Sequence, residues 1–109
     1  MKQTFTVEKI GGNVSITRFN VAAKNVIIPD CVNKIGDVAF KQSSSTYINH
    51  LLIPASVNKI ESSQFSTCKN LYNLVIEDGI KSIGNYAFHY ANVKYLYIPD
   101  SVQQMGDEV

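Results

Sequence analysis

Few residues of this chain could do chemistry, and their spacing matches no known kind of reactive site. Cys31 and Cys68 are the two cysteines, and without a Cys-x-x-Cys pair they supply too few ligands for a zinc ion. They occupy different places in the repeating pattern of the chain, so we expect two free thiols, with Cys68 buried. Neither His50 nor His89 stands at a motif distance from a nucleophilic serine. The sequence therefore predicts no catalytic, metal-binding or cofactor-binding residue, and we expect that the protein is not an enzyme.

The carboxylates, the glycines and the histidines have structural interpretations. Asp30 and Asp100 each follow a proline at equivalent places, which favours a turn role over a catalytic pair. Gly11 and Gly12 form a lone pair between two alternating apolar stretches, which predicts a hairpin turn and not a phosphate-binding loop. His50 is expected to be a solvated strand residue. Since these residues predict no reactive site, we expect the chain to function by binding another molecule.

Composition limits the class of partner. The chain has 109 residues, which is enough for one domain, and 45% of them are hydrophobic, which is enough for a core. Ten basic and nine acidic residues give a net charge of +1 without a basic stripe, so we expect no nucleic-acid partner. No stretch approaches the roughly 20 apolar residues that cross a bilayer, so we expect no membrane insertion. The N-terminus lacks an apolar signal segment. A removed leader would place the protein at the cell surface or outside the cell, and a natural start at Met1 would place it in the cytoplasm.

One motif, written four times, must build the scaffold. It reads Ile-Pro-x-x-Val-x-x-Ile-Gly-x-x-Ala-Phe, and the first copy, residues 28–40, keeps every position. The lead isoleucines are Ile28, Ile53, Ile76 and Ile98, which are 25, 23 and 22 residues apart by subtraction. A fixed period of this size predicts a solenoid, in which each unit buries its apolar side against its neighbours.

Each copy divides into three parts. A strand with inward residues two apart comes first and ends at a proline in three of the four copies. The Val-x-x-Ile step follows as a bend or a short second strand. The Ile-Gly-x-x-Ala-Phe segment has the spacing of one or two helical turns. Its aromatic residues, Phe40, Phe65 and Phe88, are expected to stack inside the coil. A serine-rich stretch after Phe40 predicts a flexible surface loop.

The first 25 residues differ from the rest. Phe5, Val7 and Ile10 alternate with polar residues, the two glycines follow, and residues 14–19 alternate again. This pattern predicts a β-hairpin. We therefore expect an N-terminal β-hairpin cap over 1–25 and about three and a half repeats over 26–109. The predicted fold class is an α/β repeat solenoid, a short right-handed coil with parallel strands on one face and short helical turns on the other.

The repeat resembles the BspA-type leucine-rich repeat, written LxIPxxVxxIgxxAFxxCxxL. The second copy supplies the fullest tail, with Phe65, Cys68 and Leu71, and the resemblance covers about residues 14–106. It implies a surface protein that adheres to host proteins or to other cells. Such proteins usually carry a leader and an anchoring module, and neither is recognisable in these 109 residues. Its last copy breaks off at residues 107–109, before the place of its phenylalanine, so the C-terminal end looks uncapped.

The outward positions of the predicted strands form two columns across the coils. The first column is Asn25, His50, Asn73 and Tyr95, and the second is Ile27, Leu52, Val75 and Tyr97. The second column is an apolar stripe, and exposed apolar patches often mark interaction sites. Strand propensity alone would also favour such residues. The predicted partner is another protein, and the predicted partner-binding residues are Ile27, His50, Leu52, Asn73, Val75, Tyr95 and Tyr97.

Two alternative functions stay open. One is a leaderless cytosolic inhibitor, from a phage or a parasite, of a host protein complex. The other is a unit that oligomerises through its C-terminal end, for example as a homodimer.

Overall fold

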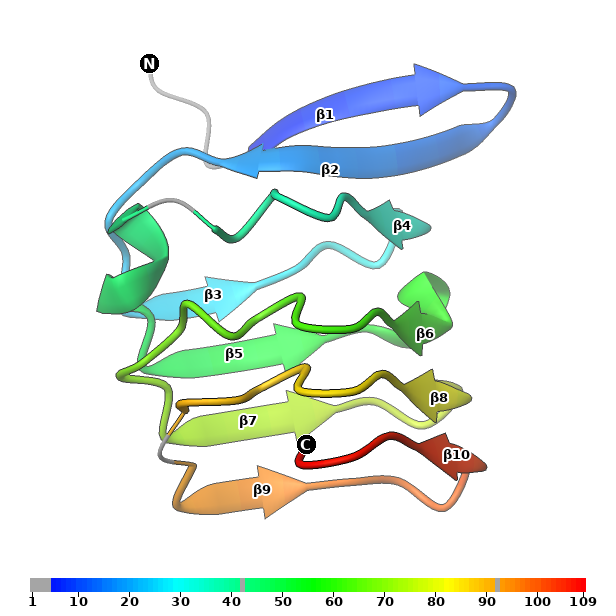
Figure 1. Ribbon diagram of the computed structural model, residues 1–109. Coiled ribbons are helices and arrows are strands. Elements are labelled where there is room, and N and C mark those ends of the chain that lie inside the picture. Colours follow the sequence, from blue (N-terminus) through cyan, green and yellow to red (C-terminus); the bar gives the residue numbers. More distant parts are fainter. Residues whose placement is uncertain (1–4, 42, 92) are drawn as a thin grey trace.

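The chain folds into a β-solenoid of four coils with a hairpin at its N-terminal end (Figure 1). The computed structural model describes residues 5–41, 43–91 and 93–109. Each coil contributes one strand to a four-stranded parallel sheet with the order β3-β5-β7-β9. These strands are β3 (Asn25–Ile27), β5 (His50–Ile53), β7 (Asn73–Ile76) and β9 (Tyr95–Tyr97). The predicted repeats are therefore stacked in register.

The Val-x-x-Ile step forms a second, shorter strand in every coil. These strands are β4 (Lys34–Ile35), β6 (Lys59–Ile60), β8 (Ser82–Ile83) and β10 (Gln104–Met105). β6, β8 and β10 form one parallel sheet, whereas β4 pairs with the N-terminal hairpin and not with β6. The short strands therefore form two separate sheets, and the break between these sheets lies between the first and second coils.

The N-terminal residues form an antiparallel hairpin of β1 (Phe5–Ile10) and β2 (Asn13–Phe19). Gly11 and Gly12 have φ angles of 53° and 88°, a left-handed conformation that glycine adopts without strain. β2 lies parallel to β4, in the place that the short strand of a preceding coil would take. The division into a cap over 1–25 and repeats over 26–109 therefore stays a prediction.

The predicted helical turns are wrong, and the fold is a β-solenoid with almost no helix. The Ile-Gly-x-x-Ala-Phe segments form turns such as the one closed by the Ala39 N–H on the Gly36 carbonyl at 3.2 Å. A helix cannot continue because the next amides bond to the neighbouring coil, as when the Phe65 N–H donates to the Ala87 carbonyl at 2.8 Å. The short 3-10 segments lie elsewhere, as η1 (Ser43–Tyr47) and η2 (Ala55–Val57). η1 occupies part of the serine-rich stretch that was expected to be a flexible loop.

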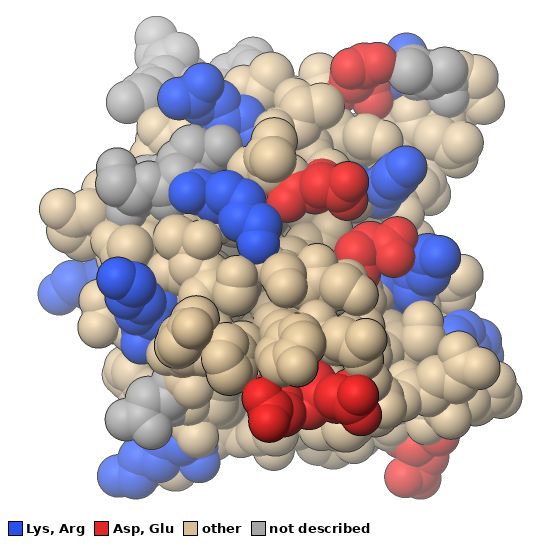
Figure 2. All heavy atoms as spheres, viewed as in Figure 1, with Lys and Arg blue, Asp and Glu red and all other residues tan. Residues whose placement is uncertain are grey.

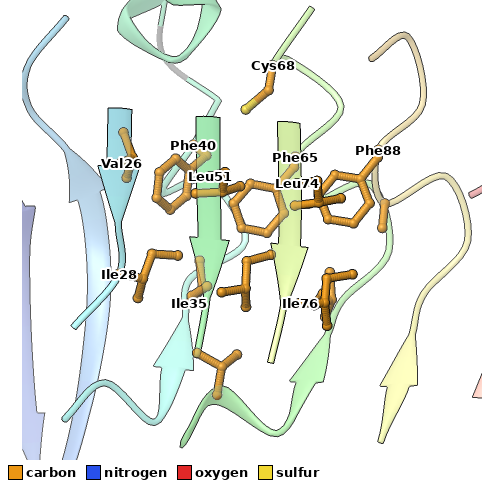
Figure 3. Close-up of a cluster of buried hydrophobic side chains, with 14 of the residues drawn as sticks. Val26, Ile28, Ile35, Phe40, Leu51, Phe65, Cys68, Leu74, Ile76 and Phe88 are labelled. Atoms are coloured by element: carbon orange, nitrogen blue, oxygen red, sulfur yellow. The ribbon is translucent and has the colours of Figure 1, made fainter. Parts of the chain in front are cut away.

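The phenylalanines of successive coils form a continuous ladder in the core (Figure 3). The ring centroids of Phe40 and Phe65 lie 4.9 Å apart, and those of Phe65 and Phe88 lie 5.3 Å apart. The predicted stack is therefore confirmed. The hairpin extends it, since Phe19 stacks on Phe40 at 5.3 Å and Phe5 lies 5.8 Å from Phe19. Hairpin and coils thus share one hydrophobic core.

Candidate interaction surface

The outward residues of the four-stranded sheet lie in the two columns that the repeat predicts. Cross-strand pairing aligns Asn25 with His50, Asn73 and Tyr95 in the first column, and Ile27 with Leu52, Val75 and Tyr97 in the second. The structure therefore brings all seven predicted binding residues onto one face, which we call the sheet face.

Apolar and aromatic groups on the sheet face are accessible to solvent. Ile27 is 71% exposed, and Tyr95 and Tyr97 are also largely exposed, whereas Leu52 and Val75 are half-buried between their neighbours. A hollow of about 220 Å³ lies over β3, β5 and β7, with Ile27, Leu52 and Val75 among its lining residues. A second one of about 380 Å³ lies over β7 and β9 and includes both tyrosines. A surface of this kind can bury apolar side chains of a partner.

Two further residues belong to this face, although sequence reasoning missed them. The Tyr72 hydroxyl lies 3.0 Å from Nε2 of His50, and the two rings are 4.8 Å apart. The Lys94 Nζ lies 5.4 Å from the centre of the Tyr95 ring. Both residues precede a strand at the same repeat position, as the bond from the Lys94 N–H to the Tyr72 carbonyl at 2.8 Å shows. No signal in the sequence pointed to them, because by period-two alternation the residue that directly precedes an outward residue would face inward.

Charge is sparse on this molecule, and the two signs are mixed. In the view of Figure 2, basic and acidic side chains are interspersed and form no continuous region of one sign. The described residues hold one ion pair, Lys59 with Glu61, at 3.7 Å. Neither column of the sheet face contains a Lys, Arg, Asp or Glu residue, so contacts with a partner there would depend mainly on apolar and hydrogen-bonding groups.

The described residues include no group of three or more His, Cys, Asp or Glu side chains that could hold a metal ion. In the same ranges, no helix is long and apolar enough to cross a membrane. Cys31 is exposed, and Cys68 is buried as predicted. Burial raises the pKa of the Cys68 thiol from 9.0 to about 12, and the positive charge of Lys41 opposes part of this rise.

The raised pKa of Cys68 predicts a loss of stability in alkali. Below pH 9 the thiol is protonated in both the folded and the unfolded chain, so the free energy of unfolding loses nothing to ionisation of this thiol. Between pH 9 and about 12 the unfolded chain releases its thiol proton first, and the free energy of unfolding falls. Urea unfolding at pH 8, 9.5 and 11 will measure this loss, and Cys68→Ala is expected to reduce it. An identical pH dependence in the variant would contradict the prediction.

Parallel strands, short second strands and a core ladder together define a leucine-rich-repeat solenoid. The sequence profile described as the BspA type leucine rich repeat region matches residues 5–109 in six copies. The chain belongs to this family, as its repeat letters indicated. Such repeats typically serve as non-enzymatic modules that bind proteins or form repeat regions at a surface.

Solved structures share the fold. The chain resembles a leucine-rich repeat protein from Bacteroides ovatus, with a TM-score of 0.73 and 25% identity over 99% of this chain and 37% of that one. A T. pallidum leucine rich repeat protein has a TM-score of 0.79 and 24% identity, over 94% of this chain and 51% of that one. A leucine rich cell surface protein from Faecalibacterium prausnitzii has a TM-score of 0.75 and 25% identity, over 98% of this chain and 32% of that one. The chain thus spans between about a third and a half of these proteins. No curated protein sequence matches it.

Proposed function

We propose that the protein binds another protein through the sheet face, as an adhesion or host-recognition module. The observation that carries this proposal is the in-register column of Ile27, Leu52, Val75 and Tyr97, which exposes apolar side chains across all four coils. The likeness to a leucine rich cell surface protein supports a role at a cell surface. Because this face carries little charge, we expect affinity to change little with salt.

Glutamate substitutions on the sheet face test this proposal. We expect the double variant Leu52→Glu with Tyr97→Glu to weaken binding at least tenfold, because a partner would have to bury two carboxylates among apolar groups. The probes are purified extracellular-matrix proteins in surface plasmon resonance, first screened for one that binds the wild type.

The matched control places the same charges elsewhere. Val38→Glu with Tyr86→Glu alters two exposed residues at the repeat position that carries Glu108 in the fourth coil. This control should keep its affinity, and circular dichroism should show that both variants are folded. Equal loss of binding in the two variants, or none in the first, would place the site elsewhere.

The predicted homodimer remains a second proposal, and one observation favours it. Leu96 and Met105 occupy core positions of the repeat but are 53% and 51% exposed in the fourth coil. A twofold pairing of β9 with β9 of a second copy would cover them. Light scattering over a range of concentrations should then show a rising molar mass. A constant monomer mass would remove the dimer.

A further inference from the structure

Neighbouring coils are joined by a repeated backbone hydrogen bond on the short-strand side, except at one junction. The N–H that follows the isoleucine donates to the isoleucine carbonyl of the preceding coil or hairpin. These bonds are Gly36 to Ile16 at 2.8 Å, Gly84 to Ile60 at 2.7 Å and Gly106 to Ile83 at 2.8 Å. Between the first and second coils, the Glu61 N–H donates instead to Oε1 of Gln64 at 3.0 Å. The Gln64 Nε2 in turn donates to the Ile35 carbonyl at 2.6 Å. A side-chain amide therefore stands between the two backbones.

The sequence explains this exception. Glu61 stands where the other coils have glycine, and Gln64 stands where the first and third coils have Ala39 and Ala87. The backbone approach needs glycine, because a Cβ on Gly84 would lie 2.5 Å from the Ser62 nitrogen. The Cβ of Glu61 prevents the same approach to the first coil. Gln64, which is 2% exposed, fills the resulting space and satisfies both backbone groups.

The two sides of this junction therefore differ in width. On the four-stranded sheet, β3 and β5 pair in register, which fixes their separation at about 4.8 Å. On the other side β4 and β6 do not pair, and Figure 1 shows them apart. A groove of about 520 Å³ opens there, with Ile35, Val57 and Glu61 among its lining residues. Two coils that are close on one side and apart on the other are tilted relative to each other. The surface of the stack is then concave on the side where the coils are close.

The hollow of the sheet face lies on that close side, over β3 and β5. We propose that Gln64, together with Glu61, is a wedge that tilts the first coil against the second and so sets the concave shape of the sheet face. Ile27 on β3 and Leu52 on β5 then lean toward each other and line one hollow. Its apolar lining, with His50 and Asn73 beside it, fits an apolar side chain of a protein partner whose neighbouring groups hydrogen-bond. This assignment of a partner rests on the proposed function, whereas the wedge does not.

A double-mutant cycle tests the wedge. Gln64→Ala alone leaves the Ile35 carbonyl and the Glu61 N–H without their partner. It should raise the ratio of unfolded to folded protein about 5- to 150-fold. Glu61→Gly with Gln64→Ala gives the second coil the glycine and alanine that the first and third coils have at these positions, so β4 and β6 can pair. We expect the double variant to be at least tenfold more stable by this ratio than Gln64→Ala. Glu61→Gly alone completes the cycle. If the stability changes of the two single variants add up to that of the double variant, the wedge is refuted.

Nuclear magnetic resonance of the double variant tests the shape and does not need the single variant to fold. A through-hydrogen-bond coupling between the amide of residue 61 and the Ile35 carbonyl should appear, and the nuclear Overhauser effect between the Ile27 and Leu52 methyl groups should weaken. Absence of the coupling, or its appearance with an unchanged methyl signal, would overturn the proposal. The outcome is independent of the glutamate variants of the sheet face, so failure of one proposal is distinguishable from failure of the other.

Discussion

Replacement of Phe65 by alanine is expected to lower the free energy of unfolding by about 3–5 kcal/mol. The Phe65 side chain is fully buried and lies between the rings of Phe40 and Phe88 at 4.9 and 5.3 Å. The hydrogen bonds between coils fix the positions of both neighbours, so the space left by the ring cannot collapse. Urea unfolding followed by circular dichroism will measure the loss.

Phe5→Ala is the control for Phe65→Ala, because Phe5 is a half-buried ring at the hairpin end of the same ladder. It should cost clearly less, since much of the ring is already in water. Equal losses at the two positions would show that the ladder is not the centre of the core.

Replacement of Gly84 by alanine is expected to cost about 1–3 kcal/mol, although it adds only one methyl group. The new carbon would lie 2.5 to 2.9 Å from three backbone atoms of Glu61 and Ser62. Backbone atoms cannot rotate away as a side chain can, so the second and third coils must separate and lose hydrogen bonds. The unfolding midpoint in urea will report this cost.

Gly36→Ala tests the specificity of that argument. A Cβ at Gly36 would meet the Ile16 carbonyl oxygen at 3.1 Å and the Thr17 Cα at 3.7 Å, which small shifts can relieve. Its cost should be smaller than that of Gly84→Ala. Neither glycine has a positive φ, so the difference between them reports contact between coils and not backbone strain.

The parts of the fold that depend on repeated positions could be predicted from the sequence. Once the copies are aligned, Phe40, Phe65 and Phe88 must stack, and Ile27 and Leu52 must share a column, because each coil copies the register of the last. The same reasoning placed the seven candidate binding residues on one surface. Whether that surface binds a partner stays a prediction, because exposure and chemistry do not name a ligand.

The missed features arise where the repeat is broken or where hydrogen bonds between coils decide the outcome. The spacing of Ala39 and Phe40 after Ile35 fits a helical turn, but the free amides bond across coils instead. Phe5 and Phe19 join the ladder from a hairpin that is out of phase with the repeat. Glu61 and Gln64 were visible as departures from the motif, yet only the structure shows that one compensates for the other.

The two ends of the solenoid differ in how they would meet other polypeptides. The outermost hairpin strand carries Glu8 and Lys9 and a register irregularity between Thr6 and Val7, features that discourage the addition of another strand. β9 at the opposite end reads Tyr-Leu-Tyr and has no charge or irregularity. Compared with β1, the outer edge of the β1-β2-β4 sheet, the edge strand β9 of the four-stranded sheet is therefore expected to accept another strand more readily. A single lysine at Leu96 would place a gatekeeper there without touching the hairpin.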